Sequence, residues 1–284
     1  MYSRKIERWD IDSEYFQSED YKLNNRVALE VSKKGYQEIS RKYTLIEPDN
    51  IEKVFRISDQ VYSAFSGSGI DLGGGVGSVS SVIARSDKVD NITCVEITEN
   101  CVTKCHPIII PKILNEKHVK VRSVIGDFNN LNIESGSLDF AVAWDSIHHS
   151  NNVVRTLLEA NRVLKDRGHL IVVDRAHNNS TDDSEIERML NIQYSKEFLI
   201  ENYLPEDKVL TRRDNGEHEY RYQQWDDFFE LSGFIVKSSF IVKESSSNNL
   251  LNKNDAGINE EFVEFELGGF ERKKVIYLLE KCEK

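Results

Sequence analysis

The spacing of hydrophobic residues changes near Ser68 and divides the chain into parts of different character. Before this point, apolar positions recur every three or four residues, which is typical of amphipathic helices. Residues 24–46 predict one helix with an interruption, and residues 48–65 predict a second with Pro48 and Asp49 at its start. The stripe of the second helix predicts core packing and is made of Val54, Ile57, Val61 and Phe65.

From Ser68 onward, short apolar runs alternate with helical segments. Such alternation predicts an α/β fold in which helices cover both faces of a mostly parallel sheet. Ligands of these sheets bind at the carboxyl ends of the strands. The predicted strands of this part are 69–72, 91–97, 119–127, 138–144 and 169–174, and the predicted helices are 79–85, 99–114 and 152–165.

The alternation stops after Asp174. Residues 176–224 are polar, with a predicted helix over 182–203 and Asn215-Gly216 between two β-prone arms, which predicts a two-residue hairpin. A short helix, 224–234, and three strands, 234–242, 262–267 and 273–280, complete the chain around a polar loop at 244–260. We therefore expect an N-terminal helical extension or lid, 1–66, and one domain, 67–284, whose insertion 176–224 caps the substrate side.

Composition narrows the possible partners. The 284 residues carry a net charge of −11, which argues against a general binder of nucleic acid. The N-terminus lacks the apolar stretch of a secretion signal, and no apolar run is long enough to span a bilayer. The four cysteines suit reduced, mostly buried thiols better than a zinc site. These features predict a cytoplasmic protein without nucleic acid or membrane partners, while a homodimer stays open.

The stretch "DLGGGVG", Asp71 to Gly77, follows a predicted strand and precedes a predicted helix. Glycines at such a corner permit positive φ angles and let a ligand approach the backbone. A dinucleotide loop is a poor match, because Ser78 stands where its third glycine would fall and Asp71 would repel a pyrophosphate. A phosphate-free ligand with a cationic centre fits the corner better.

This order of residues resembles motif I of the class I S-adenosylmethionine-dependent methyltransferases. Three further blocks resemble the same family: "CVEI" ending at Ile97, "VIGDF" ending at Phe128, and "LDFAVAWDSIHHSNN" with "LLEANRVLKDRGHLIVVD" behind it. The resemblance covers residues 68–175 and implies a Rossmann-like sheet of seven strands with an antiparallel last strand. It also implies S-adenosylmethionine as cofactor, bound by Asp71, Gly73, Gly74, Gly75, Gly77, Glu96, Ile97, Gly126, Asp127, Phe128 and Trp144.

Glu96 is placed to accept hydrogen bonds from both ribose hydroxyls, which dinucleotide enzymes also require, so it indicates a nucleoside without choosing the family. The resemblance implies that Asp127 accepts from the adenine amino group and that Phe128 covers the ring. In "KDRG", Asp166 and Arg167 replace the family's Pro-Gly, which puts only the local turn in doubt.

The candidate catalytic residues follow the fourth and fifth strands. His149 is the preferred base, because a histidine titrates near neutral pH and the family often carries a histidine pair here. Asp145 and His177 complete this set, with His148 as a structural or substrate-binding neighbour. A magnesium site at Asp145 and Asp174, with Asn178 or Asn179, is a weaker alternative, so no metal is predicted.

Arg175, Tyr220, Arg221 and Tyr222 are predicted to bind substrate together with His148. Arginines and aromatic rings suit an anionic, phosphorylated or sugar-like acceptor, so we expect methyl transfer to oxygen of a small polar metabolite. Acidic residues such as Glu217 would instead favour a small amine. A catalytically silent cofactor-binding protein is the alternative from another class.

Overall fold

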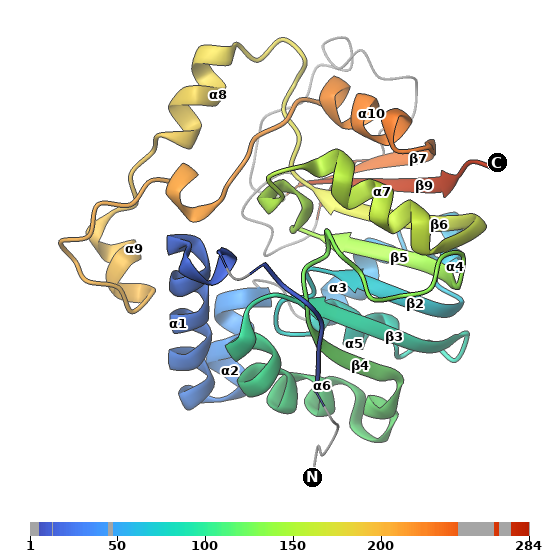
Figure 1. Ribbon diagram of the computed structural model, residues 1–284, viewed down its shortest axis with the longest axis horizontal. Coiled ribbons are helices and arrows are strands. Elements are labelled where there is room, and N and C mark those ends of the chain that lie inside the picture. The colour runs from blue at the N-terminus through green and yellow to red at the C-terminus, as the bar shows by residue number, and fades with distance from the viewer. Residues whose placement is uncertain (1–5, 13, 45–47, 244–263, 267–273, 284) are drawn as a thin grey trace.

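The computed structural model describes residues 6–12, 14–44, 48–243, 264–266 and 274–283 (Figure 1). Its helices are α1 (Glu19–Lys34), α2 (Tyr36–Ile39), α3 (Pro48–Phe55), α4 (Asp59–Ala64), α5 (Ser78–Ile83), α6 (His106–Leu114), α7 (Val153–Val163), α8 (Asp183–Leu190), α9 (Lys196–Glu201) and α10 (Tyr222–Leu231). Its strands are β1 (Glu7–Arg8), β2 (Gly67–Leu72), β3 (Val89–Glu96), β4 (Val121–Ile125), β5 (Leu138–Trp144), β6 (Leu164–Asp174), β7 (Phe234–Lys243), β8 (Glu264–Glu266) and β9 (Lys274–Lys281).

These strands form one sheet in the order β1-β4-β3-β2-β5-β6-β9-β7-β8. The last strand, β9, runs antiparallel to both β6 and β7, while the other recorded pairs are parallel. The predicted Rossmann-like fold is confirmed. The predicted count of seven strands is wrong for the described residues, because the short strands β1 and β8 extend the sheet at its two edges.

Two hydrophobic cores cover the two faces of the sheet. Helices α1 and α3–α6 contribute to one core, and α7 and α10 contribute to the other (Figure 1). Neighbouring residues of a buried parallel strand point to opposite faces, so Ile171 enters the first core and Val172 the second. The apolar runs of the central strands therefore serve both cores at once.

The N-terminal helices begin and end at recognisable signals. Ser18 caps α1 by accepting from the amide of Tyr21, and Gly35, at a φ of 82°, separates α1 from α2. The predicted second helix is divided in two, because Ser58 caps α4 separately. A π-helical turn over Ser40–Thr44 follows α2, and another over Cys101–Cys105 leads into α6. No helix in the described part of the chain is long and apolar enough to cross a membrane.

The segment between β6 and α10 packs against the N-terminal helices. The Tyr203 hydroxyl donates to Glu38 over 3.0 Å, and Lys208 pairs with Glu19 at 2.9 Å. Leu199, Leu204 and Leu210 join the first core. The N-terminal helices and the segment between β6 and α10 therefore meet beyond the carboxyl ends of the strands.

The predicted hairpin at Asn215-Gly216 is wrong. Arg213–Asn215 form a 3-10 turn and Gly216 is left-handed at a φ of 72°. The arms pair with other segments, because Thr211 bridges Gln193 and Arg221 bridges His177. The predicted loop at 244–260 lies outside the described residues.

Candidate active site

The glycine loop joins the end of β2 to α5. Gly73, Gly75 and Gly77 have φ angles of 72°, 54° and 84°, which side-chain-bearing residues rarely adopt. A Cβ on Gly74 would come within 2.3 Å of Cys94 Sγ, whereas a Cβ on Gly75 would meet no atom within 4 Å. The loop is therefore packed tightly from below at Gly74 and open at Gly75.

Two side chains hold the backbone of Gly75 in place. The Glu96 carboxylate accepts from the amide of Gly75 at 2.9 Å and from the amide of Thr98 at 2.7 Å. His106, which is fully buried, contacts the Gly75 carbonyl through Nε2 at 2.9 Å and Ser123 through Nδ1 at 2.8 Å. Burial lowers the pKa of His106 to about 4, so it is neutral and Nε2 donates. His106 was not among the residues expected to support the loop.

Asp71 lies beneath the same loop and is fully buried. Ser80 donates to its Oδ2 over 2.6 Å, and Oδ1 has no hydrogen-bond partner among the described residues. Burial raises the pKa of Asp71 to about 7. Leaving a buried carboxyl oxygen without a hydrogen-bond donor costs folding free energy. Direct contact between Asp71 and a ligand stays a prediction.

The end of β4 lies beside this loop. A Cβ on Gly126 would lie 2.9 Å from the ring of Trp9, whose backbone amide bonds Ile125 as β1 joins β4. Asp127 Oδ1 accepts from both the amide and the side chain of Asn129. The Phe128 ring lies 3.4 Å from the position of a Cβ on Gly73. Phe128 therefore borders the glycine loop, and Trp9 covers the strand end from outside the predicted domain.

Asp145 follows β5 in a left-handed conformation with a φ of 51°. It forms an ion pair with Lys274 at the start of β9, and its Oδ1 lies 3.8 Å from Arg175 Nε. Burial opposes ionisation, yet Lys274 and Arg175 hold the pKa of Asp145 well below its ordinary range. Lys274 was missed by sequence analysis because only the antiparallel placement of β9 brings it to this edge.

His148 is 1% exposed and has partners at both ring nitrogens. Its Nδ1 lies 2.6 Å from Oδ1 of Asp174, and its Nε2 contacts the guanidinium of Arg175. An arginine only donates, so Nε2 accepts and Nδ1 donates to the carboxylate. His148 is thus committed to Asp174 and Arg175 and has no lone pair left for a substrate.

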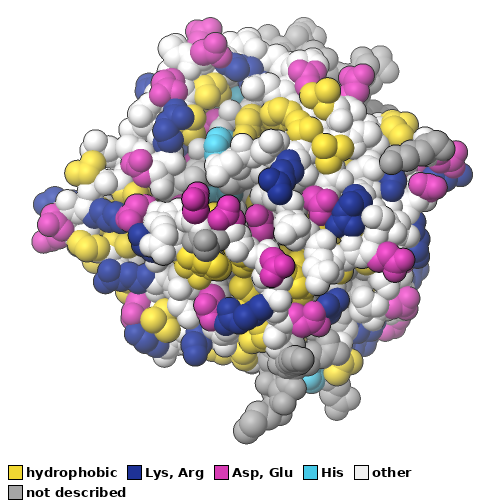
Figure 2. All heavy atoms as spheres, viewed as in Figure 1, with side chains coloured by type: hydrophobic (Ala, Val, Ile, Leu, Met, Phe, Trp, Pro, Cys, Tyr) yellow, Lys and Arg dark blue, Asp and Glu magenta, His cyan; other side chains and the backbone are white. Residues whose placement is uncertain are grey.

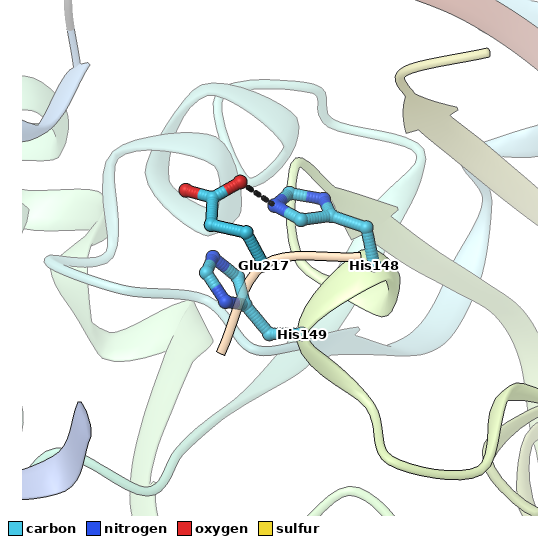
Figure 3. Close-up of side chains that lie close together, drawn as sticks. All are labelled: His148, His149 and Glu217. Atoms are coloured by element: carbon cyan, nitrogen blue, oxygen red, sulfur yellow. Dashed lines mark ion pairs between the residues drawn. The ribbon is translucent and has the colours of Figure 1, made fainter. Parts of the chain in front are cut away.

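His149 has a different environment (Figure 3). Its Nδ1 lies 3.1 Å from the carbonyl oxygen of Gly216, so Nδ1 carries the proton and Nε2 the lone pair. Burial, with help from Arg175, lowers the pKa of His149 to about 4 against the opposing charge of Glu217. His149 therefore presents a neutral acceptor at pH 7.

Arg175 and Arg212 join two glutamates in a buried network. Arg175 contacts Glu217 and lies 3.3 Å from Glu219, and Arg212 contacts Glu219 and lies 3.5 Å from Glu217. Burial opposes ionisation of both carboxyl groups, but Arg175 holds the pKa of Glu217 at about 2. His177, with the arginines, holds the pKa of Glu219 at about 2. The network is therefore fully ionised at neutral pH.

Comparison with known proteins identifies the central part of the chain. Residues 70–172 match the methyltransferase domain family. This stretch contains the glycine loop, β3 to β5 and most of β6. This central stretch is therefore similar to methyltransferase domains, the similarity that the glycine loop and the strand ends predicted.

A curated relative is the sarcosine/dimethylglycine N-methyltransferase of Aphanothece halophytica, 28% identical over 149 residues. The match takes in 50% of this chain and 50% of the relative, so the chain spans about half the length of the curated relative it matches. The activity and substrate of the relative are therefore not assigned to this chain on the basis of the match.

Solved structures share the fold at low identity. A putative methyltransferase from Bacillus halodurans is 14% identical with a TM-score of 0.53, covering 84% of this chain and 99% of its own. A putative S-adenosyl-L-methionine-dependent methyltransferase from Methanococcus maripaludis is 18% identical with a TM-score of 0.52, covering 92% and 95%. At these identities the likeness shows the fold alone.

The match to a methyltransferase domain implies S-adenosylmethionine as cofactor. The geometry fits it: the open space at Gly75 leaves room for a ligand against the backbone, and Glu96 and Asp127 place carboxylates at neighbouring strand ends. Predicted contacts at Gly73, Gly74, Gly77, Ile97 and Gly126 remain predictions. Trp144 packs edge-on against Phe55 of α3, with ring centroids 5.3 Å apart.

The predicted substrate and catalytic residues divide into two groups. His149, Asp145, His148 and Arg175 lie together at the ends of β5 and β6, as expected. Tyr222 is 1% exposed in the second core, so its predicted contact with substrate is wrong.

Three further residues of the predicted site have structural partners. Arg221 donates to the Thr181 carbonyl and pairs with Asp183 in the first turn of α8, so it fixes the start of that helix. His177 Nε2 lies 2.6 Å from Glu219, and Tyr220 stacks on His218 and packs against Trp225. A direct catalytic role for His177 and substrate contact by Tyr220 stay predictions.

Two groups of side chains have the spacing of metal ligands, namely His148, His149 and Glu217, and Asp145, His148 and Asp174. Arg175 already contacts both His148 and Glu217, and Lys274 already pairs with Asp145. Asn179, an alternative magnesium ligand, accepts from the amide of Gln223 at 2.8 Å. A metal ion would have to displace fixed cations from both groups.

Proposed function

We propose that this methyltransferase transfers the methyl group of S-adenosylmethionine to the nitrogen of a small amine. The observation that supports this most is the ion pairing of Arg175, one of the residues on which the expectation of an anionic acceptor rested, and of Arg212 beside it. Both guanidinium groups are bound to Glu217 and Glu219. They therefore have little capacity to neutralise a phosphate of the acceptor.

The charge around His149 supports the same choice. The carboxylates outnumber the cations among the described residues of this network, with Asp145, Asp174, Glu217 and Glu219 against Arg175, Arg212 and Lys274. Acidic side chains also gather near a histidine on the face shown in Figure 2. Negative potential attracts a cationic amine and repels an anion.

The chemistry of His149 supports an amine over a hydroxyl. When bound, S-adenosylmethionine supplies an electrophilic methyl group on a sulfonium. A hydroxyl acceptor benefits from a base whose pKa lies near the working pH, and the pKa of His149 is about 4. A neutral amine brings its own lone pair and needs only orientation, which Nε2 of His149 provides by accepting one N–H.

The relative from Aphanothece halophytica supports an amine acceptor, since its name describes an N-methyltransferase of sarcosine and dimethylglycine. Because the match covers only half of each chain, the acceptor itself is a matter for experiment. We offer these two molecules as probes of the amine class and not as the assigned substrates.

Paired probes test the proposal. Methyl-labelled cofactor is supplied with sarcosine and its hydroxyl counterpart glycolate, and with ethanolamine and its counterpart ethylene glycol. Transfer to an amine and not to its partner supports the proposal, and transfer to the hydroxyl partners alone overturns it. Binding of S-adenosylhomocysteine without transfer to any probe or to a wider metabolite pool would favour a catalytically silent protein.

A further inference from the structure

Asp20, in the first turn of α1, lies outside the matched methyltransferase domain and was not among the predicted site residues. A Cβ on Gly216 would lie 3.2 Å from the Asp20 carboxylate and 3.5 Å from Nδ1 of His149. Asp20 and Nδ1 of His149 therefore flank a narrow space beside Gly216, in which a Cβ would be in tight contact with the carboxylate. The N-terminal helix thus brings a carboxylate to the histidine that faces the acceptor.

The carboxylate is held in a fixed orientation. Asn24, one turn later on α1, donates to Oδ1 over 2.6 Å, and the Tyr15 hydroxyl lies 3.3 Å from Oδ2. Both partners are neutral, and among the described residues no lysine, arginine or histidine is recorded in an ion pair with Asp20. Other acids of the site, Asp145 and Glu217, have such partners.

The surroundings of Asp20 make it receptive to a cation. Burial raises the pKa of Asp20 to about 6, with further contributions from the negative charges of Glu96 and Glu217. Glu96 belongs to the cofactor side of the site and Glu217 to the side of His149. A positive ligand placed here relieves repulsion from both directions.

We propose that Asp20 binds the ammonium form of the acceptor through an N–H and so determines specificity for amines. The ammonium then gives a proton to solvent, the neutral nitrogen forms the new bond to the methyl carbon while the bond from that carbon to sulfur breaks, and S-adenosylhomocysteine leaves. This rests on the proposed function. Gly216 is part of the same arrangement, because any side chain there would fill the space between the carboxylate and His149. Tyr15 and Asn24 act as positioning residues that keep the carboxylate turned toward this space.

The test compares Asp20→Asn with the wild type and with Glu19→Gln. The first replacement is isosteric and keeps a hydrogen-bonding group beside Asn24 and Tyr15. Glu19 is the neighbouring acid, 60% exposed and paired with Lys208, so its replacement removes the same charge outside the site. Sarcosine and ethanolamine are titrated calorimetrically into protein saturated with S-adenosylhomocysteine, and KM and kcat are measured for the same probes.

We expect Asp20→Asn to weaken amine binding and raise KM about ten- to hundredfold, since a hydrogen bond to a charged group is lost. Affinity for S-adenosylhomocysteine should stay within about twofold, Glu19→Gln should behave as wild type, and Asp20→Glu should recover part of the amine affinity. Unchanged amine affinity in Asp20→Asn overturns the proposal, as does a parallel loss of S-adenosylhomocysteine binding. If Asp20→Asn does not fold, Asp20→Glu decides by the same criteria.

The result also separates this proposal from the one it rests on. Wild-type protein that methylates no amine overturns the proposed function and this assignment together. Wild-type protein that methylates an amine probe while Asp20→Asn retains its KM and binding affinity overturns the role of Asp20 alone.

Discussion

The Nδ1 atom of His149 lies 3.1 Å from the carbonyl oxygen of Gly216, and this contact fixes which nitrogen carries the proton. A carbonyl only accepts, so the lone pair is on Nε2. His148, the next residue back along the chain, has its Nε2 taken by Arg175. Adjacent histidines thus have different roles, and only His149 retains an acceptor for substrate.

We expect His149→Ala to lower kcat about 10²-fold, because loss of an orienting contact misplaces the acceptor. Affinity for S-adenosylhomocysteine, measured by calorimetry, should change less than about twofold. His118→Ala is the matched control, since His118 lies in the 3-10 turn before β4, at the amino ends of the strands. A His149→Ala variant with normal kcat would remove His149 from the reaction.

The pH dependence of kcat provides a second test of His149. Its pKa is lowered to about 4, so the neutral ring that accepts from substrate is present well above that value and is lost only as pH falls through it. The kcat of the wild type should therefore show no inflection from His149 between pH 5.5 and 8. An acid limb near 6.5 that disappears in His149→Gln would contradict this assignment.

The glycine loop offers a matched pair of substitutions. Gly75 and Gly136 both have positive φ angles, 54° and 66°, and a Cβ on either would meet no atom within 4 Å. Replacement by valine should cost each about 1–2 kcal/mol of stability through backbone strain. Only Gly75→Val should abolish S-adenosylhomocysteine binding in calorimetry, because only Gly75 faces the cofactor space. Equal affinity in the two variants would sink the loop assignment.

The sequence predicted the sheet and the cofactor loop well, because both depend on local patterns. Buried parallel strands read as apolar runs, and a glycine-rich corner after such a run has few structural uses. The family resemblance predicted that the last strand is antiparallel. It also predicted that His149 lies near the end of the strand that precedes it. What the pattern could not reveal is which distant side chains neutralise one another.

Arg175 and Glu217 illustrate this limit. Arg175 was expected to bind an anionic acceptor, but folding pairs it with Glu217 and Glu219 of a segment expected to form a hairpin. The two segments expected to be the arms of that hairpin bond to other parts of the chain and not to each other. Lys274 and Asp20 reach the site from opposite ends of the chain, and no local signal marks either.

The buried network should make Arg175 important for stability. Arg175→Met leaves Glu217 and Glu219 short of a partner in a poorly hydrated place, so we expect a loss of about 3–5 kcal/mol in chemical denaturation. The matched control is Arg188→Met, since the side chain of Arg188 is 63% exposed and pairs with Glu185 on the surface of α8. That control should lose about 0–1 kcal/mol. Similar losses in both variants would show that the network contributes little.

Asp20 should leave a signature in the pH dependence of stability, even without substrate. Its pKa is about 6 in the folded protein against an ordinary 3.8, chiefly through burial, and the groups that face it are Tyr15, Asn24, Glu96 and Glu217. Because the folded state resists ionisation, the wild type loses stability as pH rises from about 4 through 6. Asp20→Asn lacks this group.

The variant should therefore be more stable than the wild type at pH 8 and should lose most of that advantage at pH 4. Thermal unfolding of both proteins across this range, with Glu19→Gln as control, measures the difference. Saturation with an amine probe and S-adenosylhomocysteine should reduce the advantage at pH 8, because the bound cation stabilises the ionised Asp20 of the wild type. A stability difference that does not vary with pH would show that Asp20 ionises as an ordinary surface carboxyl group.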